Sequence, residues 1–390
     1  MAYTPSCTCS RADAENNIRY LKTGARTTCP DLYVLPRSAV DIDSNFVDAL
    51  AARKWGFVVV TGENGAGKSV YIQHLESVAN HFDYAVCHIE TDPIQIKQYG
   101  SVSYFTHKTL WGIRLPGGEV LMQKLLTNQA FQKQIHDVVK AHQPDFEYFS
   151  PSLTRALLAA TDRDPSRASH RDVAISWLRG EDRYLPELRP LDILDKTKSV
   201  RQVPAEKMLY LMKDLLSYLG CQGLMVSVDE IEKVGELSNL KGREALSMLR
   251  DIVNVLVSED SLPLKRGAME GLFICYAISS FFLGYSGLLE VDGVDFKAQA
   301  EKLGAPNITI QEVPRLSTLL EHGATIIRVD FDRLDDLVLV AEKIVTHYAK
   351  ANGKKVSVAP KKLAQDAFEK TNEYVARSNV MSMVSALDKT

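Results

Sequence analysis

The feature that most constrains the fold of this chain is a glycine-rich loop of the form G-x-x-x-x-G-K-S at residues 62–69. It follows four apolar residues at 57–60 and precedes a helical pattern that extends to about residue 80. In such a strand–loop–helix unit the backbone N–H groups converge on an anion, and the helix N-terminus adds positive potential. The unit predicts a nucleoside triphosphate site formed by Gly62, Glu63, Asn64, Gly65, Ala66, Gly67, Lys68, Ser69 and Val70.

Two side chains of this loop have predicted chemical roles. The amine of Lys68 is expected to reach the β- and γ-phosphates, and the hydroxyl of Ser69 is expected to bind Mg²⁺. The chain contains no N-K-x-D or T-K-x-D motif that would read guanine, and no L-S-G-G-Q signature of transporter-type ATPases. The expected cofactors are therefore ATP and Mg²⁺.

Adjacent carboxylates end the third apolar strand. Residues 224–228 are Leu-Met-Val-Ser-Val, and Asp229 and Glu230 follow at the carboxyl edge, where ligands bind in α/β sheets. We expect Asp229 to hold Mg²⁺ and Glu230 to orient and polarise the water that attacks the γ-phosphate. Two alternatives stay open: the pair caps the following helix, or Glu90, at the end of the second strand, is the catalytic carboxylate.

The fourth strand ends in two serines, Ser279 and Ser280. Either hydroxyl would lie between the phosphate-binding loop and the metal-binding carboxylate, within reach of the γ-phosphate or the attacking water. We take Ser279 as the catalytic candidate. An ordinary turn at the end of a strand is the competing interpretation.

Arginine is the remaining side chain that phosphoryl transfer uses, because its charge stabilises the transferred γ-phosphate. Arg315 lies in a short predicted helix before the fifth strand and is a candidate finger that reaches a neighbouring subunit. Arg377 begins the final helix and is a candidate sensor that closes the C-terminal helices on nucleotide. Arg250 and Arg266 are further candidates, and solvated surface charge is the alternative for all four.

The strand pattern predicts an α/β fold with a parallel sheet. Strands expected at 56–61, 84–90, 224–228, 272–278 and 324–330 alternate with helical patterns and are apolar on both faces. Between the second and third strands we expect helices at 119–141, 152–160, 170–178 and 205–219. The expected class is the P-loop NTPase core of the AAA+, additional-strand type, in which one strand separates the phosphate-loop strand from the Asp-Glu strand.

The predicted organisation has three parts, because 390 residues exceed what one compact core usually holds. We expect an N-terminal helical extension at 1–54, a P-loop ATPase core at 55–331 with a helical insert at about 91–203, and a C-terminal helical lid at 332–390. The insert is either a helical lobe packed on the core or a surface for a partner.

Charge and hydropathy limit the partners. The net charge of −3 excludes a global basic field, but Lys354, Lys355, Lys361 and Lys362 are candidates for contacting DNA phosphates. A solvated helical face is the alternative. No apolar run is long enough for a transmembrane helix, and no secretion signal is apparent, so we expect a cytoplasmic protein without a membrane partner.

The chain resembles the BREX-type P-loop ATP-binding proteins of bacterial anti-phage defence systems. The phosphate-binding loop and the Asp229-Glu230 pair are its specific motifs, and Ala-Ile-Ser-Trp-Leu-Arg-Gly at 174–180 adds to them. Members carry Thr-Pro after the fourth strand, where this chain has Ser279 and Ser280. The full set of matching stretches is 12–24, 58–70, 174–180, 223–234, 279–282 and 377–388.

The resemblance implies an AAA+/STAND-like ATPase that works beside other defence components. The first expectation is an ATP-driven switch or motor in a defence or DNA-transaction complex, assembled as a homo-oligomer, with hydrolysis stimulated by a partner or by double-stranded DNA. The alternative is a nucleotide-gated adaptor that binds ATP, changes the position of its lid and recruits protein partners with little turnover.

Overall fold

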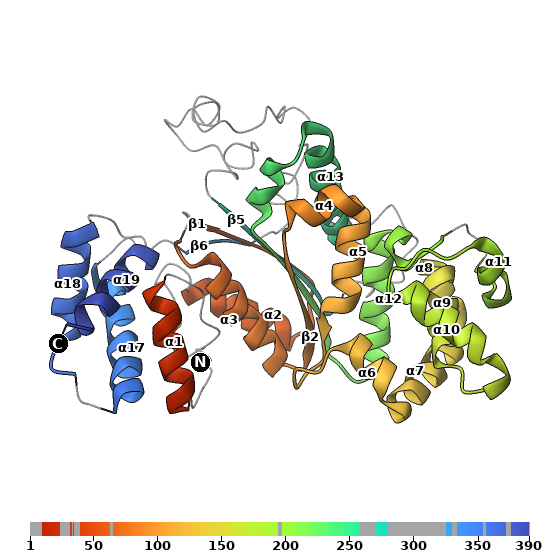
Figure 1. Cartoon of the computed structure of the whole chain (residues 1–390), viewed down its shortest axis with the longest axis horizontal. Helices are drawn as coiled ribbons and strands as arrows, with labels where there is room; N and C mark the ends of the chain where they lie inside the picture. The colour runs from red at the N-terminus through yellow and green to blue at the C-terminus, as the bar shows by residue number, and fades with distance from the viewer. Residues whose placement is uncertain are drawn as a thin grey trace.

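A six-stranded sheet in the order β3-β2-β4-β5-β1-β6 is the centre of the computed structural model (Figure 1). The structure describes residues 10–23, 32, 34, 40–62, 65–193, 197–257, 270–279, 325–329, 334–353, 356–371 and 376–389. The strands are β1 (Gly56–Gly62), β2 (Tyr84–Glu90), β3 (Ile113–Arg114), β4 (Gly223–Asp229), β5 (Leu272–Ser279) and β6 (Thr325–Arg328).

The strand order agrees with the expected separation of the two nucleotide-site strands. The strands β2, β4, β5, β1 and β6 are parallel neighbours, and β5 lies between β1, which leads into the phosphate-binding loop, and β4, which ends in Asp229. The short β3 was not expected, and it pairs antiparallel with β2 at the edge of the sheet. The prediction of a parallel sheet is therefore confirmed for five strands, and the two residues of β3 are too few to show a strand pattern in the sequence.

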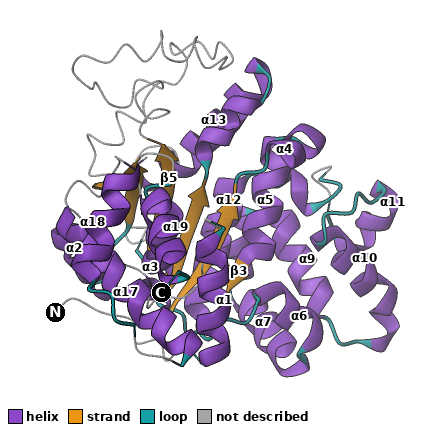
Figure 2. Ribbon diagram, turned by 60° about the vertical axis from the view of Figure 1, so that its left-hand side comes forward, coloured by secondary structure: helices purple, strands orange, loops and turns teal. Residues whose placement is uncertain are grey.

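Helices cover both faces of the sheet, as Figure 2 shows. Along β1, Val58 and Val60 pack with apolar residues of α2 (Val40–Ala51) and α3 (Lys68–His81), whereas Phe57 and Val59 belong to the apolar cluster on the opposite face. That opposite face is covered by α5 (Ser101–Gly112), α12 (Ala205–Tyr218) and α13 (Asn239–Val257). Burial on both faces explains why the strands are continuous apolar runs.

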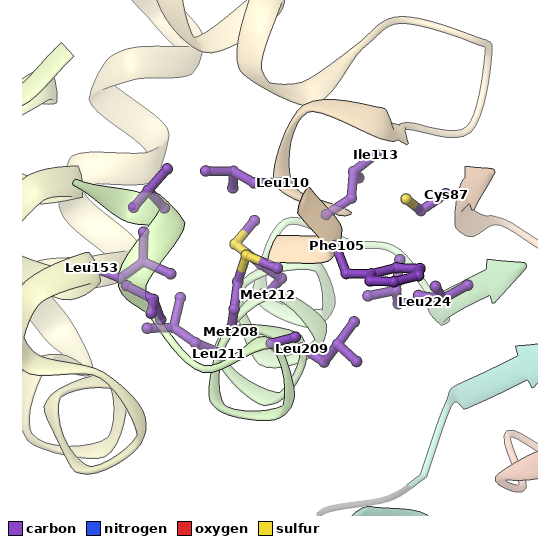
Figure 3. Packing of buried hydrophobic residues seen from close by; sticks show 14 of the residues in the cluster. Cys87, Phe105, Leu110, Ile113, Leu153, Met208, Leu209, Leu211, Met212 and Leu224 are labelled. Atoms are coloured by element: carbon purple, nitrogen blue, oxygen red, sulfur yellow. The ribbon is translucent and has the colours of Figure 1, made fainter. Parts of the chain in front are cut away.

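The segment between β2 and β4 forms a helical lobe on one flank of the sheet (Figure 1). The side chains of α12 pack between Leu153 of the lobe and the pair Phe105 and Leu224 beside the sheet (Figure 3). A single apolar cluster therefore joins the lobe to the core. Besides α5 and α12, the helices of this segment are α4 (Pro93–Tyr99), α6 (Leu121–Thr127), α7 (Gln129–Ala141), α8 (Gln143–Phe149), α9 (Pro151–Thr161), η3 (Pro165–Arg167), α10 (Ala168–Leu178), α11 (Leu185–Leu188), η4 (Arg189–Leu191) and η5 (Val200–Gln202).

One helix expected in this lobe is two helices. The pattern at 119–141 predicted a continuous helix, but α6 ends at Thr127 and α7 begins at Gln129. Between them the Oδ1 of Asn128 accepts the backbone N–H of Phe131 at 3.0 Å, and the N–H of Asn128 donates to the carbonyl of Lys124 at 2.9 Å. Asn128 thus closes one helix and caps the next, which is why the expectation was wrong.

The C-terminal helices form a third apolar cluster together with the first helix of the chain. These helices are α17 (Leu334–Asn352), α18 (Pro360–Thr371) and α19 (Ala376–Leu387), and α1 (Arg11–Lys22) lies beside α17 and α19 (Figure 1). Ala14 and Ile18 of α1 are buried against this group. Two polar contacts add to the apolar ones: Lys22 Nζ lies 2.9 Å from Asp388 Oδ1, and Arg11 Nε donates to the carbonyl of Ala351 at 3.2 Å.

Candidate functional site

The phosphate-binding loop joins the end of β1 to the start of α3. Its glycines Gly65 and Gly67 have φ angles of 88° and 106°, in the region that residues with a Cβ avoid. At Gly67 an added Cβ would meet no heavy atom within 4 Å, so the backbone conformation, and not the space around it, requires glycine there. These two glycines therefore give the loop a tight turn before the N-terminus of α3, and its anion binding stays a prediction.

Lys68 is the first residue of α3 and is almost fully buried. Its Nζ donates to the carbonyl of Gly62 at 3.0 Å and lies 3.8 Å from Oε1 of Glu232. The ammonium therefore lies between the carbonyl oxygen of Gly62, where the loop begins, and the carboxylate of Glu232.

Asp229 ends β4, a strand that is buried over its whole length. The Asp229 side chain is fully buried, and its Oδ1 accepts the backbone N–H of Glu230 at 2.8 Å. Its main-chain carbonyl accepts two bonds from Thr91, from the N–H at 3.0 Å and from Oγ1 at 2.8 Å. These bonds attach the acidic pair to the end of β2, so Asp229 has little freedom to move.

Glu230 has a left-handed backbone with φ 56°, which is unusual for a residue other than glycine. It precedes the 3₁₀-helix η6 (Ile231–Glu236), and its Oε2 pairs with Nζ of Lys233. The same ammonium lies 3.8 Å from Oε1 of Glu90, so Lys233 bridges the two carboxylates that were rival candidates for the catalytic role. Glu90 is the more exposed of the two, at 56% against 23% for the Glu230 side chain.

Glu232 is a site residue that no sequence motif predicts. Its Oε2 accepts the backbone N–H of Ser279 at 3.2 Å, while its Oε1 faces Lys68. Burial raises the pKa of the Glu232 carboxyl, and the nearby Lys68 ammonium opposes this shift. The only hint in the sequence is a second carboxylate two residues after Glu230, in a segment whose apolar residues, Ile231, Val234 and Leu237, recur at every third position.

Ser279 and Arg377 both lie next to the phosphate-binding loop. Ser279 is the register partner of Gly62 across β5 and β1, and its side chain is buried. The backbone N–H of Arg377, at the start of α19, donates to the carbonyl of Gly65 at 3.2 Å, while the Arg377 side chain is exposed. The C-terminal helices therefore touch the loop directly.

Several predicted residues lie outside the described part of the chain. They are Glu63 and Asn64 of the loop, Ser280, Arg315 with its predicted helix, and Arg266. Arg250 lies within α13, but its side chain is not described. Lys354 and Lys355 are also outside the described residues, whereas Lys361 and Lys362 are exposed in the first turn of α18.

The donors available to a metal ion suit Mg²⁺ and not a softer metal. The hydroxyl of Ser69 and the carboxylate of Asp229 are hard oxygen ligands, and Mg²⁺ commonly takes one or two protein oxygens with phosphate and water completing its shell. Among the described residues, no group of three or more His, Cys, Asp or Glu side chains could hold a metal ion. Ser69 and Asp229 are therefore the residues that would hold a magnesium ion bound to phosphate.

Comparison with known proteins identifies one family. The model of the family described as "BREX system ATP-binding protein BrxC/D" matches residues 122–389. The match contains Asp229, Glu230 and the C-terminal helices, and it begins after the phosphate-binding loop. No curated protein and no solved structure gives a significant match.

Within the described residues, no helix is both long and apolar enough to cross a membrane.

Proposed function

Since this chain belongs to the family of BREX system ATP-binding proteins BrxC/D, we propose that it binds ATP with Mg²⁺ and hydrolyses it as an AAA+-type switch or motor. In this proposal it works in an anti-phage defence or DNA-transaction complex, together with other defence proteins. The observation that carries the proposal is the convergence of Lys68, Asp229-Glu230 and Ser279 at one edge of the sheet, with Glu232 in contact with both Lys68 and Ser279.

Each residue has one role in the proposed reaction. The loop of residues 62–70 binds the triphosphate through its backbone, and Lys68 neutralises the β- and γ-phosphate charge. Ser69 and Asp229 hold Mg²⁺, which supplies charge neutralisation on the phosphates when bound. Glu230 orients the attacking water, and Ser279 donates to the γ-phosphate or to that water.

Two arginines complete the proposed site. Arg377 acts as the sensor, and its backbone contact with Gly65 supports a role for α19 in reporting nucleotide occupancy. Arg315 acts as a finger from a neighbouring subunit, so turnover would require a homo-oligomer. Lys361 and Lys362 on α18 are the described candidates for contacting double-stranded DNA.

One observation favours the alternative of a nucleotide-gated adaptor with little turnover. Glu230 is paired with Lys233. An opposite charge beside a carboxylate favours its paired form, so the carboxylate is less available to polarise a water. A protein of this second type would bind ATP tightly and hydrolyse it only after a partner released Glu230.

ATP hydrolysis by the wild-type chain and by Glu230→Gln tests the proposal, with Glu90→Gln as the matched variant. The hydrolysis rate of each protein is measured with and without double-stranded DNA. The affinity for ATP is measured in parallel, and so is the size of the particles in the presence of ATP. We expect Glu230→Gln to lose about 10²-fold or more in turnover while it still binds ATP, because a positioned base contributes that much to the rate.

Other outcomes would redirect the assignment. Loss of turnover in Glu90→Gln alone would transfer the catalytic role to Glu90. Tight ATP binding without turnover in any condition would favour the adaptor. Particles of the same size with and without ATP would count against nucleotide-driven assembly.

A further inference from the structure

A second pocket lies outside the nucleotide site, between α4, α5 and η5 at the edge of the sheet near β2 and β3. Its volume is about 410 Å³. His88 of β2 and Gly112 at the end of α5 are in its wall, and the remaining lining residues come from the two helices and from Arg201 of η5. None of the residues named so far for ATP hydrolysis lines it.

Flat side chains form much of the wall. Tyr99 is 43% exposed, and the guanidinium of Arg201 lies over its ring at 4.3 Å from the centroid. The rings of His107 and Trp111 are stacked, with centroids 6.1 Å apart and planes inclined by 26°. Planar surfaces of this kind favour a planar ligand, since stacking on an aromatic ring or a guanidinium requires a flat partner.

The charge of the wall is positive. Lys108 and Arg201 line the pocket, and among its described lining residues there is no carboxylate. Burial, with the charges of Arg201 and Lys108, lowers the pKa of His107 to about 4, so this imidazole is neutral at pH 7. Behind the wall, Asp92 lies close enough to Lys108 for their charges to interact, and Glu76 pairs with His88. The wall itself carries two cations and no carboxylate, which favours an anionic group on the ligand.

The polar side chains of the wall are held in place. Arg201 Nε donates to the carbonyl of Gly180 at 3.1 Å, and the indole N–H of Trp111 donates to the carbonyl of Leu178 at 2.8 Å. The amide of Gln95 is oriented by a 2.7 Å bond to Asp92, and Gln98 lies beside it in the wall. Amide side chains both donate and accept, as the edge of a nucleobase requires.

We propose that this pocket binds a nucleotide unit, with its base on the aromatic and amide surfaces and its phosphate at Lys108 and Arg201. The unit is either a free nucleotide or one residue of a single-stranded nucleic acid, since both present the same base and phosphate. The binding does not depend on ATP hydrolysis at the other site.

The pocket is also connected to the predicted catalytic edge. Tyr104 lines the pocket, and its hydroxyl donates to the main-chain carbonyl of Glu90. The carboxylate of Glu90 lies 3.8 Å from Lys233, which pairs with Glu230. If the proposed function holds, occupancy of the pocket would be relayed to the catalytic carboxylate through this chain of contacts.

The test uses the full chain with its phosphate-binding loop saturated by ATPγS and Mg²⁺. One probe is a fluorescently labelled twelve-residue oligo(dT), followed by anisotropy, and the other is AMP, followed by quenching of tryptophan fluorescence. Tyr99→Ala and Arg201→Gln are compared with Arg19→Gln, which removes an exposed arginine on α1, a helix that packs with α17 and α19. We expect the two pocket variants to weaken binding about ten-fold, because stacking contributes ~1–3 kcal/mol per base, and Arg19→Gln to bind as the wild type does.

The two probes distinguish the source of the nucleotide. Binding of AMP alone would identify a free nucleotide, and binding of oligo(dT) alone a single-stranded nucleic acid. Trp111→Phe should abolish the quenching by AMP, whereas Trp55→Phe should leave it intact. Binding of neither probe, or equal binding by wild type and Tyr99→Ala, would overturn the proposal; Tyr99 is exposed enough that its removal should leave the fold intact.

Discussion

At the scale of single residues, Glu232 is the least expected part of the nucleotide site. Its carboxylate contacts the ammonium of Lys68, the group proposed to bind phosphate, and the N–H of Ser279. A carboxylate and a phosphate are both anions, so they compete for the same positive region. In the proposed site, Glu232 and the phosphates of ATP therefore compete for Lys68.

We therefore predict that Glu232→Gln binds ATP more tightly than the wild type. Removal of the negative charge leaves Lys68 more available to phosphate, and an ion pair of this kind is worth about 0.2–1 kcal/mol, or roughly 1.4- to five-fold in Kd. Titration with a fluorescent ATP analogue in the presence of Mg²⁺ measures the change.

Glu236→Gln is the matched control, because Glu236 is an exposed carboxylate on the same 3₁₀-helix. It removes the same charge from η6 without touching Lys68. If both variants shift the Kd equally, the effect comes from the general charge of the helix, and the competition between Glu232 and phosphate is refuted.

The residues of the site were only partly predictable from the sequence. Lys68 and Asp229 follow from local motifs, because each lies at or just after the carboxyl end of a strand, at the same edge of the sheet. Glu232 could not be derived, because its contact with Lys68 depends on the turn of η6 and on the adjacency of β5, neither of which is a local property. The pocket residues Tyr99 and Arg201 are about one hundred positions apart, so no spacing in the sequence connects them.

At the scale of elements, the sequence predicted the strands better than the helices of the lobe. β2 begins and ends where it was expected, because a run that is buried on both faces has sharp polar limits. The helices α4 and α5 were missed, since Pro93 and Gly100 interrupt a segment with no clear apolar face. Such breaks separate helices only when tertiary packing stabilises each short piece.

The boundary at Asn128 gives a prediction for stability. Asn128→Ala removes the side-chain acceptor for the N–H of Phe131, and the loss of an N-cap costs about 1 kcal/mol. We expect the midpoint of urea unfolding, followed by circular dichroism, to fall accordingly. Thr127→Ala, one residue earlier and exposed, should change the free energy of unfolding by less than about 0.5 kcal/mol. An equal loss in both variants would show that Asn128 has no special capping role.

At the scale of the whole molecule, the described residues form three apolar clusters. Two lie on the opposite faces of the sheet, one of them joining the sheet to the helical lobe, and the third joins α17, α18 and α19 to α1. The N-terminal helix therefore belongs by its packing to the helices at the other end of the chain. The sequence could not show this, because the apolar face of an amphipathic helix does not specify which element packs against it.

The cluster of the C-terminal helices with α1 predicts a local loss of protection when α1 is weakened. Ile18→Ala opens a cavity among α1, α17 and α19, which typically costs about 2–4 kcal/mol. Hydrogen exchange should become faster in α17 and remain unchanged in α3, which packs on the sheet in a different cluster. Asn16→Ala, on the exposed side of α1, is the control and should alter neither helix. Faster exchange in both α17 and α3 of Ile18→Ala would show that these two clusters unfold together.

The bond from Arg11 to the carbonyl of Ala351 joins residues that are 340 positions apart. During translation α1 leaves the ribosome long before α17 exists, and at ~10 residues per second this interval is roughly half a minute. Throughout that time its apolar side has no native partner. During that interval the apolar face of α1 is exposed and available to other apolar surfaces. A chain whose synthesis stops early would keep that face exposed.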